Sequence, residues 1–563
     1  MTLDAVSVEV IGNRLISIVN EQQAALVRTA FSTIVRESED LACGVFDPRG
    51  WMVAQSLTGT PGHINAMATG MRHVVEAYPE ERLDPGDVLV TNDPWQTSGQ
   101  VNDFTVATPV FHDGRVAGWF ANTCHAADVG GRVLSGEARE VFEEGLRLPI
   151  MKLFHAGEPN EELLDIVRVN VRTPGETVGD LYAQTASNDV GARRLVELLE
   201  EIGLDTLAPA SDEIVGRSER AMREAIREVP NGVYEAETWS DGFEEPIRLH
   251  ATVTVEDDEV AIDFAGSSPQ SGHGINVVLN YTHAYASFAM KAAFAPDVPH
   301  NEGSFRPVHV TAPEGSILNA QPPAAVGSRH VIGHFIPGVL FKALAPALPG
   351  RLLAGGADSI WLNVIRGQQA DGDWFTLSLF QAGGAGARAQ KDGLSATGFP
   401  TGVGGVPAEV LETLTPLVQH KRELRTDSAG AGRMRGGLGQ ATELSCLSGE
   451  PWTISALADR TQFPGSGVEG GRDGAVGELT RGDGSPLPPK RLVTLDPDER
   501  IRLNPAGGGG YGDPSERDPD RLLRDVVDGY VSLEAAEREY GVKIVYTGPA
   551  DALVRTPDMY RRT

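Results

Sequence analysis

The stretch DFTVATPVFHDGRVAGWFANTCHAADVGG, residues 103–131, decides how this chain folds. β-Branched and aromatic residues flank His112-Asp113-Gly114 on both sides, which is typical of a β-hairpin. Folding the chain about this turn places Asp103 opposite Thr123, so His125 emerges about two residues beyond that pair. We therefore expect Asp103 and His125 to lie at the same end of a β-ribbon, within a few ångströms of each other.

Further hairpins and amphipathic helices are predicted around this ribbon. Turn residues between apolar segments predict hairpins over 41–54 and 251–264. Apolar residues at three- and four-residue steps predict helices near 11–27 (behind a cap at Ser7), 161–171, 195–201, 218–228, 284–293, 518–528 and 533–540. Because helices and hairpins mix without a regular β-α alternation, we predict an α+β fold with several mixed sheets, hairpins and packed helices.

The length predicts more than one compact region. We expect an N-terminal α+β region with the candidate site over 1–240 and a central β-rich region with a packed helix over 241–380. A glycine-rich C-terminal region ending in helices would cover 381–563.

The charge balance excludes several classes of protein. The 563 residues carry a formal net charge of −30 with a pI near 4.8, which is the opposite of what nucleic-acid binders and basic membrane-surface proteins need. The 3 cysteines form no CxxC pair, and no apolar run reaches the ~18 residues that a membrane span needs. We expect an acidic, soluble, cytoplasmic protein that binds neither nucleic acid nor membranes.

An aspartate and a histidine that meet at a strand end are a candidate site for Mn²⁺, Zn²⁺ or Fe²⁺. Asp128 follows three residues after His125, and Asp40, which joins the first helix to its hairpin, can face the same place. The alternative is structural, with His125 as a hydrogen-bonded strand-end residue, Asp128 as a turn former and Asp40 as a solvated helix end. His63 is interpreted as an exposed loop histidine. Spacing alone leaves both interpretations of the site open.

Other chemistries have less support in the sequence. Glu144 is a candidate general base, although most such acidic pairs are simply solvated. No Walker P-loop occurs, and the glycine runs at 384–388 and 507–512 offer either backbone N–H groups for an anion or close-packed turns. Cys124 is rejected as a nucleophile because it and His125, as neighbours on one strand, point to opposite faces.

Several long motifs occur in order along nearly the whole chain. They are Arg36–Asp40, Thr91–Pro94, His125–Gly131, Asn301–Pro307, Ala382–Gly393, Arg433–Gly437, Gly507–Pro514 and Tyr540–Val542. In these motifs the chain resembles the hydantoinase B/oxoprolinase family. The resemblance implies a two-part enzyme in which an A-type subunit or domain binds ATP and phosphorylates a carbonyl or amide oxygen. The B-type chain then hydrolyses a lactam-like ring or, in the ketone carboxylases, joins an enol phosphate to carbon dioxide.

The resemblance implies that the metal site of this family maps onto Asp103 and His125. We add Asp40 and Asp128 to the expected metal-binding set, with Asp40 nearby and Asp128 orienting His125. Many relatives carry a histidine where this chain has Gln100, and a second one where it has Ala126. An amide oxygen is a weak ligand for Zn²⁺, so the resemblance implies a metal that is bound less tightly, replaced by a harder ion, or lost.

The remaining expected roles combine this resemblance with the residue patterns described above. Asp103, His125 and Glu144 are the expected catalytic residues, and substrate or phosphate binding is assigned to Arg388, Lys391 and Asp392 of the glycine-rich motif. ATP would act through an A-type partner in a hetero-oligomer. The first hypothesis is a B-type subunit of an ATP-dependent hydrolase of cyclic amides such as hydantoins or oxoproline-like lactams. The alternatives are a subunit of an acetone- or acetophenone-type carboxylase and a non-catalytic subunit that scaffolds its partner.

Overall fold

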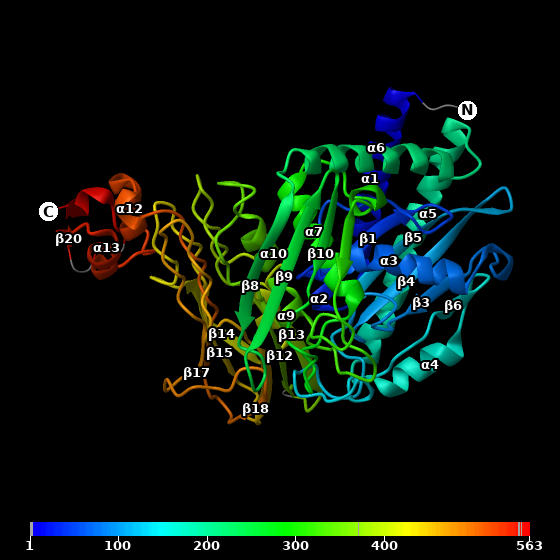
Figure 1. Ribbon diagram of the computed structural model, residues 1–563. Coiled ribbons are helices and arrows are strands. Elements are labelled where there is room, and N and C mark those ends of the chain that lie inside the picture. The colour runs from blue at the N-terminus through cyan, green and yellow to red at the C-terminus, as the bar shows by residue number, and fades with distance from the viewer. Residues whose placement is uncertain (1–3, 370, 550–551, 553, 563) are drawn as a thin grey trace.

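The computed structural model describes residues 4–369, 371–549, 552 and 554–562. The predicted α+β class is confirmed, since hairpin sheets and helices mix without regular alternation (Figure 1). No helix in this part of the chain is long and apolar enough to cross a bilayer. The helices are α1 (Ala5–Thr29), α2 (Thr33–Arg36), α3 (Pro61–Ala77), α4 (Glu161–Asn170), α5 (Pro174–Ile202), α6 (Ala208–Arg227), α7 (Leu279–Phe294), α8 (Glu302–Phe305), α9 (His330–Gly333), α10 (Phe335–Leu344), α11 (Ala408–Leu414), α12 (Pro519–Val527) and α13 (Leu533–Tyr540).

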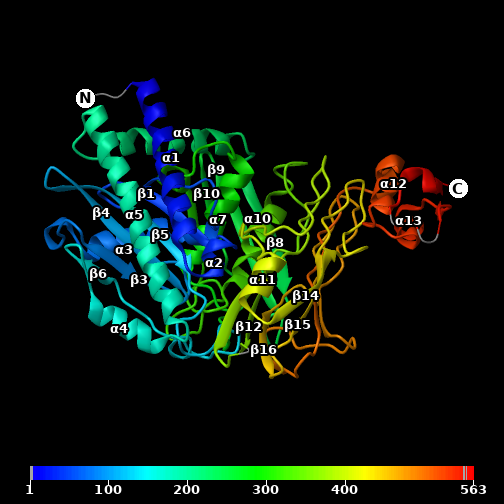
Figure 2. The ribbon, with the colours of Figure 1, turned by 180° about the vertical axis from the view of Figure 1, so that it is seen from behind.

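The N-terminal part is built on a 7-stranded antiparallel sheet with the order β2-β1-β5-β4-β3-β6-β7. Helices α1 and α5 lie side by side over one face (Figure 2), and α3 covers the other. Its strands are β1 (Leu41–Phe46), β2 (Met52–Gln55), β3 (Val88–Thr91), β4 (Asp103–His112), β5 (Arg115–His125), β6 (Met151–His155) and β7 (Glu158–Pro159).

Side chains of β5 alternate between two hydrophobic cores. Phe120 packs in the core that holds α1 and α5, whereas Trp119 and Ala121 pack in the core that holds α3. This alternation follows from the two-residue period of a strand. Because helices cover both faces, β5 is buried from Val116 onwards.

The β4–β5 hairpin has a register that differs by two residues from the predicted one. The structure pairs Asp103 with His125, and Thr105 rather than Asp103 with Thr123. The turn is only Asp113-Gly114, both at positive φ (49° and 77°), and the register shifts again at a bulge between Val110 and Phe111 of β4. Each of these features shifts the pairing by one residue, so Asp103 and His125 are direct partners rather than offset neighbours.

The central part holds a 4-stranded sheet of order β11-β10-β9-β8, with only the β10–β11 pair parallel. Its strands are β8 (Gly232–Ser240), β9 (Ile247–Glu256), β10 (Glu259–Asp263) and β11 (Val308–Thr311). Helices α7 and α10 pack against this sheet in the largest hydrophobic core. The predicted boundary at 240 falls between the paired strands β8 and β9, and the division into three regions stays a prediction.

Two further 4-stranded antiparallel sheets, β13-β12-β16-β18 and β14-β15-β19-β17, enclose a second large core. Their strands are β12 (Trp361–Gln368), β13 (Trp374–Gln381), β14 (Leu417–Leu424), β15 (Gln440–Cys446), β16 (Trp452–Leu457), β17 (Glu478–Arg481), β18 (Leu492–Leu495) and β19 (Ile501–Asn504). Beyond them α12, α13 and a small hairpin of β20 (Ile544–Tyr546) and β21 (Tyr560–Arg562) form a separate cluster at one end of the molecule (Figure 1).

Glycine-rich segments connect this cluster to the sheets and pack backbone against backbone. The N–H of Gly508 donates to the carbonyl of Gly437, and the N–H of Gly430 donates to the carbonyl of Gly508. A Cβ atom at Gly508 would collide with the carbonyl group of Ala385. The N–H groups of 507–510 all donate to backbone carbonyls. These glycines therefore serve close packing, and their N–H groups are already used within the chain.

Candidate functional site

Asp103 and His125 lie at the paired ends of β4 and β5. They are register partners, and His125 Nδ1 lies 3.1 Å from Asp103 Oδ1. Both side chains are buried, and Asp103 has no exposed surface. The structure therefore brings together the two residues that hairpin spacing predicted to meet.

Four nitrogen atoms surround the Asp103 carboxylate. Gln100 Nε2 lies 2.6 Å and His125 Nδ1 lies 3.1 Å from Oδ1. His63 Nε2 lies 3.0 Å and Arg329 Nη2 lies 2.5 Å from Oδ2. Burial opposes ionisation of Asp103, but the charges of His63 and Arg329 outweigh it and hold the pKa of this carboxyl well below its usual range. Asp103 is thus a buried, fully surrounded carboxylate.

Asp40 orients the other side of His63. Its Oδ1 accepts the hydroxyl hydrogen bond of Thr60 at 3.0 Å and lies 3.6 Å from His63 Nδ1. Its carbonyl accepts the N–H of His125 at 3.2 Å. Pro61 begins α3, so His63 sits in the first turn of a helix rather than in an exposed loop, and its side chain is buried. The proline at the helix start was the signal in the sequence that could have shown this.

Arg329 and His330 reach the site from a distant part of the chain, at the start of α9. Arg329 also donates through Nε to the carbonyl of Ser98 at 2.5 Å, and its guanidinium carbon lies 4.1 Å from the ring centroid of Tyr281. Sequence reasoning missed Arg329, His330 and His334. They have no local pattern that links them to Asp103, because only tertiary packing joins the two segments.

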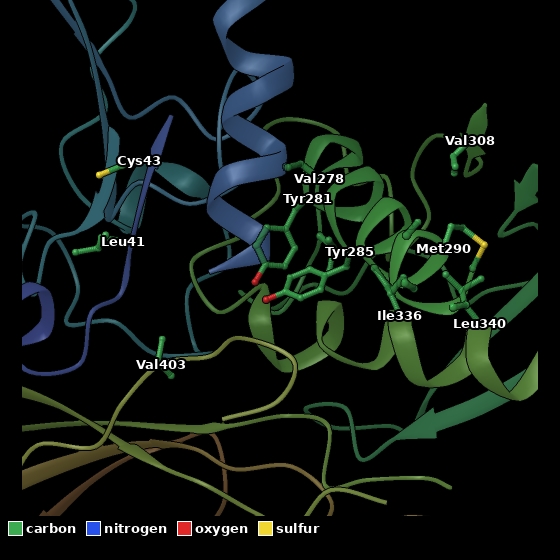
Figure 3. Packing of buried hydrophobic residues seen from close by; sticks show 14 of the residues in the cluster. Leu41, Cys43, Val278, Tyr281, Tyr285, Met290, Val308, Ile336, Leu340 and Val403 are labelled. Atoms are coloured by element: carbon green, nitrogen blue, oxygen red, sulfur yellow. The ribbon is translucent and has the colours of Figure 1, made fainter. Parts of the chain in front are cut away.

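A cavity of about 30 Å³ lies beside these residues. Four imidazoles line it, and within the described part of the chain each has one buried ring nitrogen without a hydrogen-bond partner: His63 Nδ1, His125 Nε2, His330 Nε2 and His334 Nδ1. The opposite walls are largely apolar and include Ile360, Leu362, Phe380 and Val403. Figure 3 shows Tyr281, which also lines the cavity, leaving α7 on the same side as Tyr285, with the Val403 loop nearby. The cavity therefore combines ring nitrogens that lack hydrogen-bond partners with apolar walls.

Burial sets the charge states in this cavity. It lowers the pKa of His330 to about 3, lowers that of His334 well below its ordinary value, and raises the pKa of Tyr281 to about 12. These three groups are therefore neutral near pH 7. Burial opposes protonation of His63, but the carboxylates of Asp103 and Asp40 outweigh it and raise the pKa of this imidazole, so His63 joins Asp103 and Arg329 as a group whose charged form the site favours.

Asp128 and Glu144 contact other residues than Asp103 and His125. Asp128 forms an ion pair with Arg172, with Nη1 at 2.5 Å from Oδ1, and is not among the residues that line the described cavity. Glu144 Oε1 accepts the backbone N–H groups of Val326 at 2.8 Å and of Gly327 at 2.6 Å. These two residues form the turn before Arg329, so Glu144 stabilises the turn that positions the arginine.

The predicted substrate- or phosphate-binding residues lie in the glycine-rich part. Arg388 and Lys391 pair through their backbones in a turn, with the Arg388 N–H donating to the Lys391 carbonyl at 2.9 Å. Asp392 accepts from Arg517 at 2.9 and 3.0 Å and from Arg521 at 2.7 Å. Asp392 thus ties the C-terminal cluster to the glycine-rich segments, and a role of these residues in binding phosphate stays a prediction.

The contacts around Asp103 do not fit a resident divalent cation. A carboxylate offers about four lone-pair positions; Gln100, His63 and Arg329 direct nitrogens at three of them, and the ring of His125 packs against Oδ1 with Nδ1 at 3.1 Å. Arg329 already neutralises the charge that would attract a metal. Across the described residues, no group of three or more His, Cys, Asp or Glu side chains is arranged to hold a metal ion. The predicted Mn, Zn or Fe remains a prediction without support from these contacts.

Comparison with known proteins gives consistent matches along the chain. The family described as hydantoinase B/oxoprolinase matches residues 4–514. The B-type subunit of a putative D-/L-hydantoinase from a Pseudomonas species is 31% identical, covering 96% of this chain and 95% of that protein. The crystal structure of ATP-dependent caprolactamase from Pseudomonas jessenii is 29% identical, with a TM-score of 0.90 and coverage of 98% of each chain. Nucleotide-free acetone carboxylase shares the fold, with a TM-score of 0.83, 20% identity and coverage of 99% of this chain and 81% of that one.

Proposed function

Because this chain belongs to the hydantoinase B/oxoprolinase family, we propose that it is the B-type subunit of an ATP-dependent cyclic-amide hydrolase. Its substrate would be a hydantoin- or lactam-like ring that an A-type partner phosphorylates on the amide oxygen. Two relatives support this assignment, one named as the B-type subunit of a putative hydantoinase and the other as an ATP-dependent caprolactamase. The two parts would form a hetero-oligomer.

The observation that carries the proposal is the cavity beside Asp103. Its unpartnered imidazole nitrogens can bind a polar reacting group, and its volume of about 30 Å³ suits a water molecule or the reacting oxygen of a substrate rather than a whole ring. Arg329 lines the cavity, and its buried ion pair with Asp103 provides fixed, oriented charges that act on a reacting group more strongly than they would in solvent. These features match a reaction in which an oxygen becomes negatively charged.

The proposed chemistry consumes two water molecules. Phosphorylation of the amide oxygen makes its carbon electrophilic, and the first water adds to that carbon. The ring C–N bond then breaks, the nitrogen takes up a proton and an acyl phosphate remains. A second water hydrolyses the acyl phosphate to a carboxylate and inorganic phosphate. In this scheme His125 and His330 hold the water or the substrate oxygen through Nε2, and the apolar walls exclude further water.

The test is ring opening by the purified chain together with an A-type subunit, ATP and a panel of hydantoin, oxoproline and caprolactam. We expect ring opening and phosphate release that depend on both chains and that His125→Asn abolishes. The matched control is His155→Asn, at an exposed position on β6 of the same sheet. Turnover of a ketone that requires bicarbonate would favour the carboxylase alternative. Unchanged turnover by the His125→Asn complex would favour a scaffold role for this chain.

A further inference from the structure

The side chain of Gln100 lies between Asp103 and His125. Its Nε2 atom is 2.6 Å from Asp103 Oδ1 and 2.8 Å from His125 Nδ1, and the residue is 3% exposed. An amide nitrogen carries two hydrogens, which matches these two short contacts. If the amide were turned round, its oxygen would face the carboxylate oxygen at the same short distance, and two negative atoms would repel each other. Asp103 therefore fixes the orientation of the amide.

This orientation determines which nitrogen of His125 carries the proton. The Gln100 contact to Nδ1, at 2.8 Å, is shorter than the 3.1 Å separation of Nδ1 from Asp103 Oδ1. A hydrogen on Nδ1 could donate to Asp103 Oδ1 at 3.1 Å, but it would leave Nδ1 only 2.8 Å from an amide nitrogen that is itself a donor. With Nδ1 as the acceptor of the shorter contact, the proton lies on Nε2. Nε2 is buried, lacks a partner in the described part of the chain and belongs to a residue that lines the cavity. His125 thus offers an N–H donor to whatever occupies the cavity.

The amide and Arg329 together take the positions that a cation would need. Gln100 bridges the carboxylate and the imidazole, and Arg329 supplies the positive charge at Oδ2 at 2.5 Å. We propose that Gln100, rather than a divalent cation, links Asp103 to His125 in this chain and holds His125 as its Nε2–H tautomer. Gln100 is then a positioning residue, and the Nε2–H group binds the oxygen of the activated amide. Binding of the amide oxygen by Nε2–H rests on the proposed function, whereas the amide link and the tautomer do not.

The first experiment measures metal binding directly. The purified full chain, wild type and Gln100→His, is incubated with Mn²⁺, Zn²⁺ or Fe²⁺, desalted and analysed for metal content and thermal stability. We expect less than about one tenth of an equivalent and no rise in Tm for the wild type, and tighter binding with a rise in Tm for Gln100→His, because an imidazole supplies a stronger ligand. Gln270→His, at an exposed position, controls for the added histidine. One equivalent of metal in the wild type that Asp103→Asn removes would overturn the proposal.

The second experiment reads the tautomer by ¹⁵N NMR of histidine-labelled protein. His125 is assigned by the signal that disappears in His125→Asn. The wild type is expected to show a protonated Nε2 and an unprotonated Nδ1. In Gln100→Leu, Nδ1 loses its donor and is free to donate to Asp103 at 3.1 Å, so the proton should move to Nδ1. A protonated Nδ1 in the wild type, or an unchanged signal in Gln100→Leu, would refute the role of Gln100. Neither experiment uses turnover, so failure of this inference is distinct from failure of the proposed function.

Discussion

Removing the charge of Asp103 alone is expected to destabilise the chain strongly. Asp103→Asn keeps the side-chain shape but leaves the Arg329 guanidinium, of which 3% of the side chain is exposed, without its carboxylate at 2.5 Å. Breaking a buried ion pair by removing one partner costs about 3–5 kcal/mol, whereas removing both charges together is often nearly neutral. Asp103→Asn and Arg329→Met should therefore each lose about 3–5 kcal/mol of unfolding free energy, and the double variant should recover most of that loss.

The assay is a double-mutant cycle, with urea midpoints and Tm measured for all four proteins. Asp113→Asn is the matched control, because it makes the same change at the far end of the same hairpin, where the side chain is 82% exposed. The control is expected to change stability by less than about 0.5 kcal/mol. If the two single changes simply added in the double variant, the buried pair would not be coupled and the description of the site would be wrong.

Three further changes test other parts of the structure. Burial raises the pKa of Glu144 to about 8; the N–H groups of Gly327 and Val326 and the charge of Arg329 oppose this shift, and Glu143 adds to it. The contribution of Glu144 to the free energy of unfolding is therefore fully present below about pH 4.5 and is lost as the pH rises towards 8. The free energy of unfolding of Glu144→Gln should therefore equal that of the wild type near pH 5 and exceed it by about 1.4 kcal/mol for each further pH unit, as measured by thermal unfolding. A difference that does not change with pH would argue against a buried, protonated Glu144. Asp392→Asn leaves the buried Arg517 with a weaker partner and should speed proteolytic release of the segment with α12 and α13; equal cleavage rates in the variant and the wild type would contradict this link. Gly508→Ala should lower Tm by many degrees because its Cβ meets backbone, whereas Gly175→Ala, with open space around it, should not; similar Tm values would refute the close packing.

Local chemistry in the sequence predicted a good part of the fold. The hairpins at 41–54 and around Asp113 appear where the turn residues placed them, and the helices at 161–171 and 533–540 agree closely with α4 and α13. The segment 195–201 proved to be only the last part of the much longer α5, because polar residues that are buried against the sheet hide its periodicity. The first helix begins at Ala5 behind Asp4, whose carboxylate accepts the N–H of Ser7, so Ser7 is not the cap.

The candidate site was predictable only where the sequence itself brings residues together. A hairpin places Asp103 beside His125, and two irregularities moved the register without separating them. Arg329 lies 226 residues from Asp103, and no local spacing could have joined them. Gln100 lies three residues before Asp103, but the direction of its amide depends on contacts that exist only in the folded chain. Tertiary packing therefore supplied the positive charge and most of the imidazoles of the cavity.

The catalytic role of the buried Asp103–Arg329 pair is tested most directly by single-turnover ring opening by the reconstituted complex with ATP. Wild type and Asp113→Asn are expected to open the ring of a phosphorylated cyclic amide at the same rate. The folded double variant Asp103→Asn/Arg329→Met should be at least about 100-fold slower, because it lacks the fixed charges of the site. A double variant that is folded, binds its partner and opens the ring at the wild-type rate would show that the chemistry takes place elsewhere.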